Sequence, residues 1–285
     1  MKELNGIRIG SAGNPANFYL TEYKREIMNC PTWLREIGLD AYEFQATHGV
    51  NTPKDRAELL GANAKKADVA LSIHAPFFVV LTSKDKAIVE RSIGRLMQAT
   101  KLADIENATK VVFHPGYYGE DKKLAFNACA DGLMRAIDET KNSRVHFCPE
   151  TGGKTSSLGS LEELIEFDKL HERIELCVDF AHHHARTQGS LKTPKDFEKI
   201  LETIERELGK KSVERLHCHF SQLIYGDKGE RAHCSAYELG MGPDYRAFCK
   251  AVVDYSIKPT IICETQDTQD VMGLKIKKEF EKLIK

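Results

Sequence analysis

Short apolar runs alternate with longer helical patterns along this chain of 285 residues, and the alternation limits the folds that the chain can adopt. The apolar runs have the length of buried strands and are bounded by glycine, proline and polar residues. They cover residues 7–11, 41–45, 69–74, 110–114, 144–150, 174–179, 213–219 and 260–264. Helical periodicity covers residues 21–37, 52–66, 84–105, 122–141, 161–171, 194–208 and 244–255, and a lysine-rich helix ends the chain.

Eight strands that alternate with eight helices, without a linker between them, are typical of a single (β/α)₈ barrel, the TIM barrel. Such barrels take about 250 residues, so we predict one α/β domain that spans residues 1–285. The carboxyl ends of the parallel strands meet at one face of this fold, where active sites lie. A long polar loop is expected at residues 220–244 of the same face.

The composition favours a globular protein, because 41% of the residues are hydrophobic and 29% are charged. No apolar run approaches the roughly 18 residues of a membrane span, and the first residues do not resemble a signal peptide. We therefore expect a cytoplasmic monomer without a membrane partner. The net charge of −1 does not exclude a nucleic-acid substrate, because such an enzyme needs only a local basic face.

Imidazole and carboxylate side chains recur at the carboxyl ends of the predicted strands. The third to eighth strands end on His74, His114, Glu150, Asp179, His219 (or His217) and Glu264, and the loops behind them add His182, Glu230 and His233. A lone residue of this kind more often hydrogen-bonds a loop, but six at equivalent positions are not independent. Carboxylates crowded into one mouth repel each other unless cations neutralise them. Imidazole mixed with carboxylate favours zinc, manganese or iron, so the pattern predicts a site for several metal ions.

The residues alone leave some positions open. Period 2 along a strand sends His217 and His219 to the same face, and we prefer His219 as the ligand because it lies nearer the strand end. The spacing of three residues from Asp179 favours His182 over the two histidines that follow it. The residues that could contact a phosphate, or could equally be plain surface charges, are Lys154, Lys228 and Arg231.

The strand ends lie in short motifs that together resemble the signatures of the endonuclease IV family, AP endonuclease family 2. The motifs are Ser-Ile-His-Ala-Pro at 72–76, Phe-His-Pro-Gly at 113–116, Pro-Glu-Thr at 149–151, Cys-Val-Asp-Phe-Ala-His at 177–182 and Cys-Glu-Thr at 263–265. Each motif is short, but they occur in the order of the family from the third predicted strand to the eighth.

This resemblance implies a xylose isomerase-like TIM barrel with apurinic/apyrimidinic endonuclease activity in DNA base-excision repair. It implies a zinc cofactor with three ions expected, although two ions and manganese also fit. Glu150 would bridge two ions as the catalytic residue, and a zinc-activated hydroxide would cleave the phosphodiester 5′ to abasic sites in double-stranded DNA. The zinc ligands implied are His74, His114, Glu150, Asp179, His182, His219, Glu230, His233 and Glu264.

The chain departs from the family in its seventh strand and in the loop that follows. The family has a His-x-Asn-Asp-like run and then Asp-x-His, whereas this chain has His-Cys-His-Phe-Ser at 217–221 and Glu-Arg-Ala-His at 230–233. The alternative function is a metal-dependent sugar or sugar-phosphate isomerase or epimerase of the related barrels. Those enzymes pair glutamates as Glu150 and Glu264 would, and Glu43 could add a contact. A non-catalytic barrel that binds metal or nucleic acid is a third hypothesis.

Overall fold

Eight parallel strands form the centre of the structure, a computed structural model that describes residues 4, 6–46, 49–238 and 242–284. The strands are β1 (Arg8–Ala12), β2 (Ala41–Gln45), β3 (Ala70–His74), β4 (Lys110–Phe113), β5 (His146–Pro149), β6 (Cys177–Asp179), β7 (His217–Phe220) and β10 (Thr260–Cys263). Most residues of each strand are buried, as a sheet that is covered on both faces requires.

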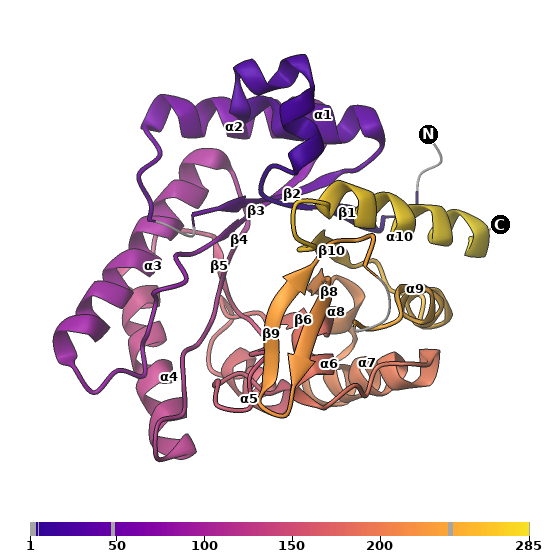
Figure 1. The fold of residues 1–285 in the computed structure, drawn as a ribbon. Helices are drawn as coiled ribbons and strands as arrows, with labels where there is room; N and C mark the ends of the chain where they lie inside the picture. The colour runs from indigo at the N-terminus through magenta and orange to yellow at the C-terminus, as the bar shows by residue number, and fades with distance from the viewer. Residues whose placement is uncertain (1–3, 5, 47–48, 239–241, 285) are drawn as a thin grey trace.

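The sheet closes into a barrel (Figure 1), with strand order β5-β4-β3-β2-β1-β10-β7-β6. Two isolated parallel bridges, Phe147 with Ile174 and Glu150 with Cys177, join the two edges of this sheet. The predicted (β/α)₈ fold is therefore confirmed. Because all strands of a closed parallel barrel run the same way, their carboxyl ends share one mouth.

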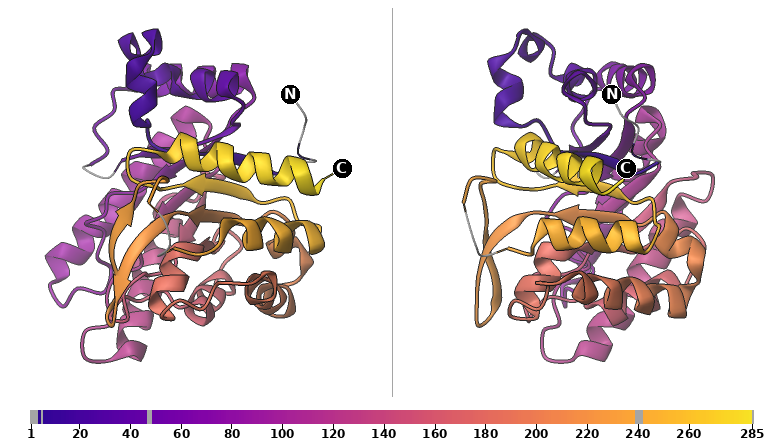
Figure 2. Two further views of the ribbon diagram at one scale, coloured as in Figure 1. Left: turned by 45° about the vertical axis from the view of Figure 1, so that its right-hand side comes forward. Right: turned by 90° about the vertical axis from the view of Figure 1, so that its right-hand side faces the viewer.

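Helices surround the barrel: α1 (Cys30–Ile37), α2 (Lys54–Ala67), α3 (Lys86–Glu106), α4 (Lys122–Glu139), α5 (Leu161–Asp168), α6 (Phe180–Arg186), α7 (Pro194–Leu208), α8 (Lys210–Glu214), α9 (Tyr245–Asp254) and α10 (Gln269–Leu283). Successive helices pack on one another around the outside, as α9 and α10 do in Figure 2. The helix α7 shows the local cause: Thr193 and Asp196 form a capping box, and Pro194 occupies the first turn. Its buried side chains recur at the spacing of one helical face, at Phe197, Ile200, Leu201 and Ile204.

Two predicted elements are wrong in part. The predicted helix at 21–37 begins only at Cys30, after three short 3₁₀ helices, because Pro31 has no N–H group and suits only the first turn of a helix. The predicted strand at 213–219 begins only at His217, and its first two residues belong to α8. Val213 is a buried residue of this helix and not of a strand. A short apolar run alone does not distinguish a buried strand from a buried helix segment.

The region predicted as a polar loop, residues 220–244, contains a β-hairpin. Its strands are β8 (Gln222–Gly226) and β9 (Gly229–Cys234), which pair antiparallel and lie against α6. Figure 1 shows the hairpin as two orange arrows that are separate from the barrel sheet. The hairpin extends the wall of the barrel on the side of β6 and β7, and it carries two of the predicted ligands.

One continuous cluster of buried apolar side chains runs from Leu4 to Phe280 and fills the space between the barrel and its helices. The single-domain prediction for residues 1–285 is consistent with this cluster and stays a prediction. Among the described helices, none has the length and apolar content needed to cross a membrane.

Candidate metal centre

The predicted ligands meet at the carboxyl ends of the strands in three groups. Within each group, one nitrogen or oxygen atom of every member lies within 4.8 Å of the corresponding atoms of the others. The groups are His74, His114 and Glu150; Glu150, Asp179, His219 and Glu264; and His182, Glu230 and His233. Glu150 belongs to two of the groups and also contacts His182 of the third, so the three form one connected centre. Each group could hold a metal ion.

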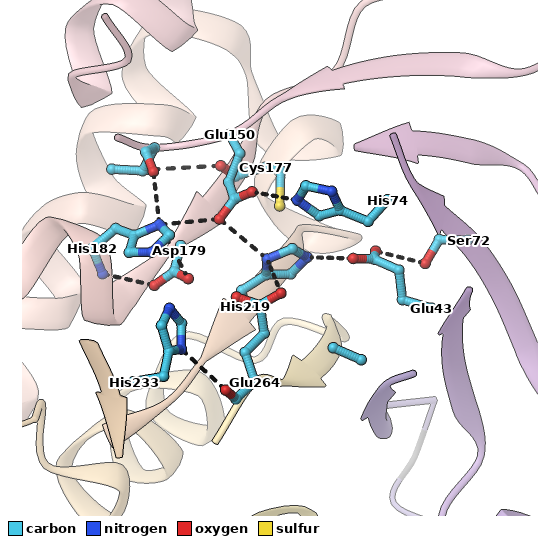
Figure 3. A network of polar contacts seen from close by, with 12 residues as sticks. Glu43, Ser72, His74, Glu150, Cys177, Asp179, His182, His219, His233 and Glu264 are labelled. Carbon is cyan, nitrogen blue, oxygen red and sulfur yellow. Dashed lines mark hydrogen bonds and ion pairs between the residues drawn. The ribbon is translucent and has the colours of Figure 1, made fainter. Parts of the chain in front are cut away.

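Glu150 lies in the middle of the centre (Figure 3), directly after β5, and its side chain is fully buried. Its Oε2 atom lies 3.1 Å from Nε2 of His74, and its Oε1 atom lies 3.1 Å from Nδ1 of His182 and 3.3 Å from Nδ1 of His219. Burial alone would raise the pKa of Glu150, but the surrounding imidazoles, led by His114, hold it well below its usual range. The two oxygens thus face different groups, as a bridging carboxylate requires.

Three of the histidines have their Nδ1 atoms close to backbone carbonyl oxygens. A carbonyl oxygen only accepts hydrogen bonds, so Nδ1 carries a proton, and in the neutral imidazole Nε2 has the lone pair that a metal ion needs. Metal-binding histidines are usually oriented in this way. The pairs are His74 with Ala75, His182 with Thr151 and His233 with Glu264, at 2.9, 3.0 and 3.0 Å.

Asp179 links a helix end to the centre. Its Oδ1 atom caps α6 by accepting from the backbone N–H of His182 at 2.7 Å. Its Oδ2 atom is buried and makes no hydrogen bond within the described part of the chain, although Nδ1 of His182 lies 3.3 Å away. Burial raises the pKa of Asp179 to about 6. A buried carboxylate oxygen without a hydrogen bond is costly, and a cation among these donors would remove that cost. The residues therefore fit a metal centre.

A β-bulge brings Glu230 and His233 to the same side of β9. Residues three apart in a regular strand point to opposite faces. Adjacent residues of β8 face Ala232 and Glu230, so Arg231 is an extra residue in β9. The bulge leaves Nε2 of His233 3.5 Å from Oε1 of Glu230. It also explains the spacing by which this chain departs from the endonuclease IV pattern.

Gly153, a residue that the motifs did not single out, allows the third group to assemble. A Cβ atom at this position would lie 2.5 Å from Oε2 of Glu230 and 2.8 Å from Cδ2 of His182. The carbonyl oxygen of Gly153 also accepts from the backbone N–H of Glu230 at 2.9 Å. The glycine therefore lets the loop after β5 pack directly against two candidate ligands. The Gly-Gly pair at 152–153 was the available signal in the sequence.

The three candidate phosphate contacts come from two adjoining segments, the loop after β5 and the hairpin. Lys154 follows Gly153 and bridges to Gly229 in the hairpin, and Lys228 and Arg231 flank that position. The side chains of Lys154, Lys228 and Arg231 are exposed. A cavity of about 390 Å³ at the mouth is lined by His114, His182 and Glu264, and the three basic residues are not among its lining residues.

The neighbours of each side chain distinguish the histidines among which the sequence left the choice of ligand open. The structure brings His219 into the second group, whereas Nε2 of His217 lies 3.0 Å from Oε2 of Glu43 in the barrel interior. His184 accepts a hydrogen bond from the backbone N–H of Leu191 at 3.0 Å and packs edge-on against Tyr225. It therefore has a role in packing.

Comparisons of sequence identify relatives of this architecture. The family described as the xylose isomerase-like TIM barrel matches residues 31–285. An uncharacterized protein of Methanocaldococcus jannaschii is 35% identical over 236 residues, which are 81% of this chain and 84% of that protein. A protein named "Probable endonuclease 4" from Mycoplasma pneumoniae is 30% identical over 178 residues, which are 60% of each chain.

Comparisons of structure support the fold without deciding the chemistry. Endonuclease IV from Thermus thermophilus has a TM-score of 0.72 at 16% identity and covers 97% of this chain and 99% of its own. A D-tagatose 3-epimerase-like protein also has a TM-score of 0.72, at 17% identity, and covers 98% of both chains. At these identities the likeness shows the barrel alone, so the function has to be argued from the side chains.

Proposed function

Since the chain belongs to the xylose isomerase-like TIM barrel family, we propose that it is a metal-dependent endonuclease for abasic sites in double-stranded DNA. The proposed reaction is hydrolysis of the phosphodiester bond 5′ to the abasic site, in base-excision repair. The motifs that resemble endonuclease IV support this proposal, as does the similarity to a protein named "Probable endonuclease 4". Such an enzyme would work as a monomer in the cytoplasm, which light scattering and cell fractionation would test.

The observation that carries the proposal is the meeting of all nine candidate ligands in three groups connected through Glu150. A barrel that binds a single metal needs only the second group. The first and third groups would then bring five further side chains to the mouth without a purpose. We propose three zinc ions, with manganese as the alternative, because imidazole and carboxylate ligands suit both metals.

Divalent ions held in this centre would lower the pKa of water and stabilise the negative charges of a phosphodiester under attack. The chain itself would supply three further functions. Glu150 would help to hold the ions, because its two oxygens face different groups of candidate ligands. Carbonyl oxygens would fix the histidine rings, and Lys154, Lys228 and Arg231 would bind phosphates on either side of the abasic site.

The test combines metal analysis with a cleavage assay. Protein purified without chelators should contain about three zinc ions per chain, one for each group of ligands. It should incise a DNA duplex that contains one tetrahydrofuran abasic analogue, on the 5′ side. Glu150→Gln should abolish incision and lower the metal content, while Glu90→Gln, an exposed glutamate on α3, should change neither.

The second group alone favours the sugar epimerase as a competing function, because its four ligands come from four strand ends and suit one metal ion. An epimerase would contain one or two ions per chain. It would interconvert ketohexoses and leave abasic DNA intact. That result would replace the endonuclease proposal.

A further inference from the structure

We infer that Glu43 is a positioning residue, which holds the imidazole of His219 with its Nδ1 atom toward the metal ions. The inference rests on the proposed metal centre, and it adds a residue from β2, a strand that contributes none of the nine candidate ligands. It also assigns His219 one tautomer and one ligating nitrogen.

A carboxylate at the position of Glu43 needs an explanation. Glu43 is fully buried in the barrel, where branched apolar side chains normally fill the interior. A buried carboxylate is destabilising unless it is paired and hydrogen-bonded. Glu43 lies two residues before the end of β2, one layer below the mouth, and it aligns with Ser72 of β3. It is therefore too deep to reach a substrate and is placed to act on the layer above.

The two oxygens of Glu43 have different partners. Oε2 accepts from the hydroxyl group of Ser72 at 2.8 Å and lies 3.0 Å from Nε2 of His217. Oε1 lies 3.1 Å from Nε2 of His219, as Figure 3 shows. Oε1 of Glu43 and Nε2 of His219 are both buried, and neither makes a hydrogen bond among the described residues, so the two atoms meet as an ion pair. The contacts with Ser72 and His217 thus fix Oε2 of Glu43, and Oε1 faces His219.

The opposite nitrogen of His219 faces the centre. Its Nδ1 atom lies 3.3 Å from Oε1 of Glu150 and 3.4 Å from Oε1 of Glu264. Carboxylates thus flank both nitrogens, but Glu150 and Glu264 are candidate ligands that a metal ion would engage, whereas Glu43 is not. With an ion bound there, the proton of His219 would stay on Nε2 beside Glu43, and Nδ1 would offer its lone pair. A carboxylate behind a metal-binding histidine fixes its tautomer and ring orientation and makes it a better ligand. Glu43 has this position.

The inference is tested by metal affinity, which does not depend on the substrate. Metal-free protein would be titrated with zinc in competition with a chromophoric chelator. Glu43→Ala should weaken the site that contains His219 by about 10–100-fold. Glu43→Gln should weaken it less, because the amide oxygen can still accept from Nε2. Glu106→Gln, which changes another buried carboxylate outside the centre, should leave zinc affinity as in the unmodified chain.

A double-mutant cycle separates positioning from a general loss of structure. If Glu43 acts through His219, Glu43→Ala should not weaken zinc binding further in a His219→Ala background. Additive losses would overturn the inference, and so would unchanged affinity in both Glu43 variants. If the chain binds three zinc ions but leaves abasic DNA intact, the proposed function fails while the affinity measurements still decide the role of Glu43.

The strongest competing explanation is an additional metal ion inside the barrel. The thiol of Cys177 lies within 4.8 Å of ring nitrogens of His217 and His219. An ion there would bind the imidazoles of His217 and His219, both of which contact Glu43. A fourth zinc ion that disappears in Cys177→Ser would overturn the inference, whereas three ions in both proteins would support it.

Discussion

Substitution of Gly153 by alanine should remove one metal ion and leave the barrel folded. The added Cβ atom would lie 2.5 Å from Oε2 of Glu230 and 2.8 Å from Cδ2 of His182. To restore ordinary van der Waals contact, these groups would have to move by about 0.5–1 Å. Metal–ligand distances tolerate only about 0.2 Å, so the third group should lose its ion.

The fold should survive because the groups that clash include the ends of side chains, which can rotate away, and because Gly153 does not have a positive φ. We expect the affinity of the third site for zinc to fall about 100-fold, which corresponds to ~3 kcal/mol. Elemental analysis after dialysis against a weak chelator should then find one ion fewer than in the unmodified protein.

Gly94→Ala is the matched control for this substitution. Gly94 lies in α3, and a Cβ atom there meets nothing within 4 Å. The control should retain every ion and gain about 0.5–1 kcal/mol in the free energy of unfolding, because alanine favours the helix. A Gly153→Ala protein with the full metal content and native zinc affinity would refute the packing of this loop against the third group.

Three further predictions concern β9, a buried carboxyl group and the protons of the centre. A protein that lacks Arg231 should keep all its metal ions in elemental analysis. Removal of this extra residue of the bulge leaves Glu230 and His233 two apart, on one face of a regular strand. Loss of an ion would show that the bulge does not set their orientation. Burial raises the pKa of Glu106 to about 8 from 4.5. Between these pH values the unfolded chain has released a proton that the folded chain keeps. The free energy of unfolding therefore falls as pH rises. Glu106→Gln should remove this slope and raise the free energy of unfolding at pH 7 by about 3 kcal/mol, measured by urea denaturation at several pH values; an unchanged slope would contradict the assignment. Burial lowers the pKa of His74, but the facing carboxylates, led by Glu150, raise it to about 9. Zinc binding at pH 7.5 should therefore release protons and weaken as pH falls. Calorimetry in buffers of different ionisation enthalpy would measure the proton release, and binding without it would refute the prediction.

Much of the site could be predicted because its information is local. His74, His114 and Glu150 each follow an apolar run, and such runs are readable from residue type and length. Once the strands are parallel and the barrel closes, their carboxyl ends must meet, whatever the loops between them contain. The predicted helix at 21–37 failed for the opposite reason, because its periodicity competed with Pro31 and with local side-chain bonds such as that of Glu26 to the N–H of Met28.

The third group shows what depends on pairing between strands. The spacing of Glu230 and His233 does not place them on one face unless β9 contains a bulge, and the bulge exists only in relation to β8. Likewise, Gly153 has no visible function until the loop after β5 packs against the hairpin. The sequence contains these residues, but it does not state their partners.

Strand β7 shows the same difference between what the sequence and what the tertiary structure determines. The sequence by itself determined that His217 and His219 both enter the barrel, because side-chain alternation is a property of any strand. Only the tertiary structure decided which of them faces the candidate metal centre. That choice depends on contacts across the barrel: Glu43, 174 positions before His217, faces both histidines, and His219 also reaches Glu150 and Glu264. Contacts across such a distance arise from the closed fold, which no local pattern encodes.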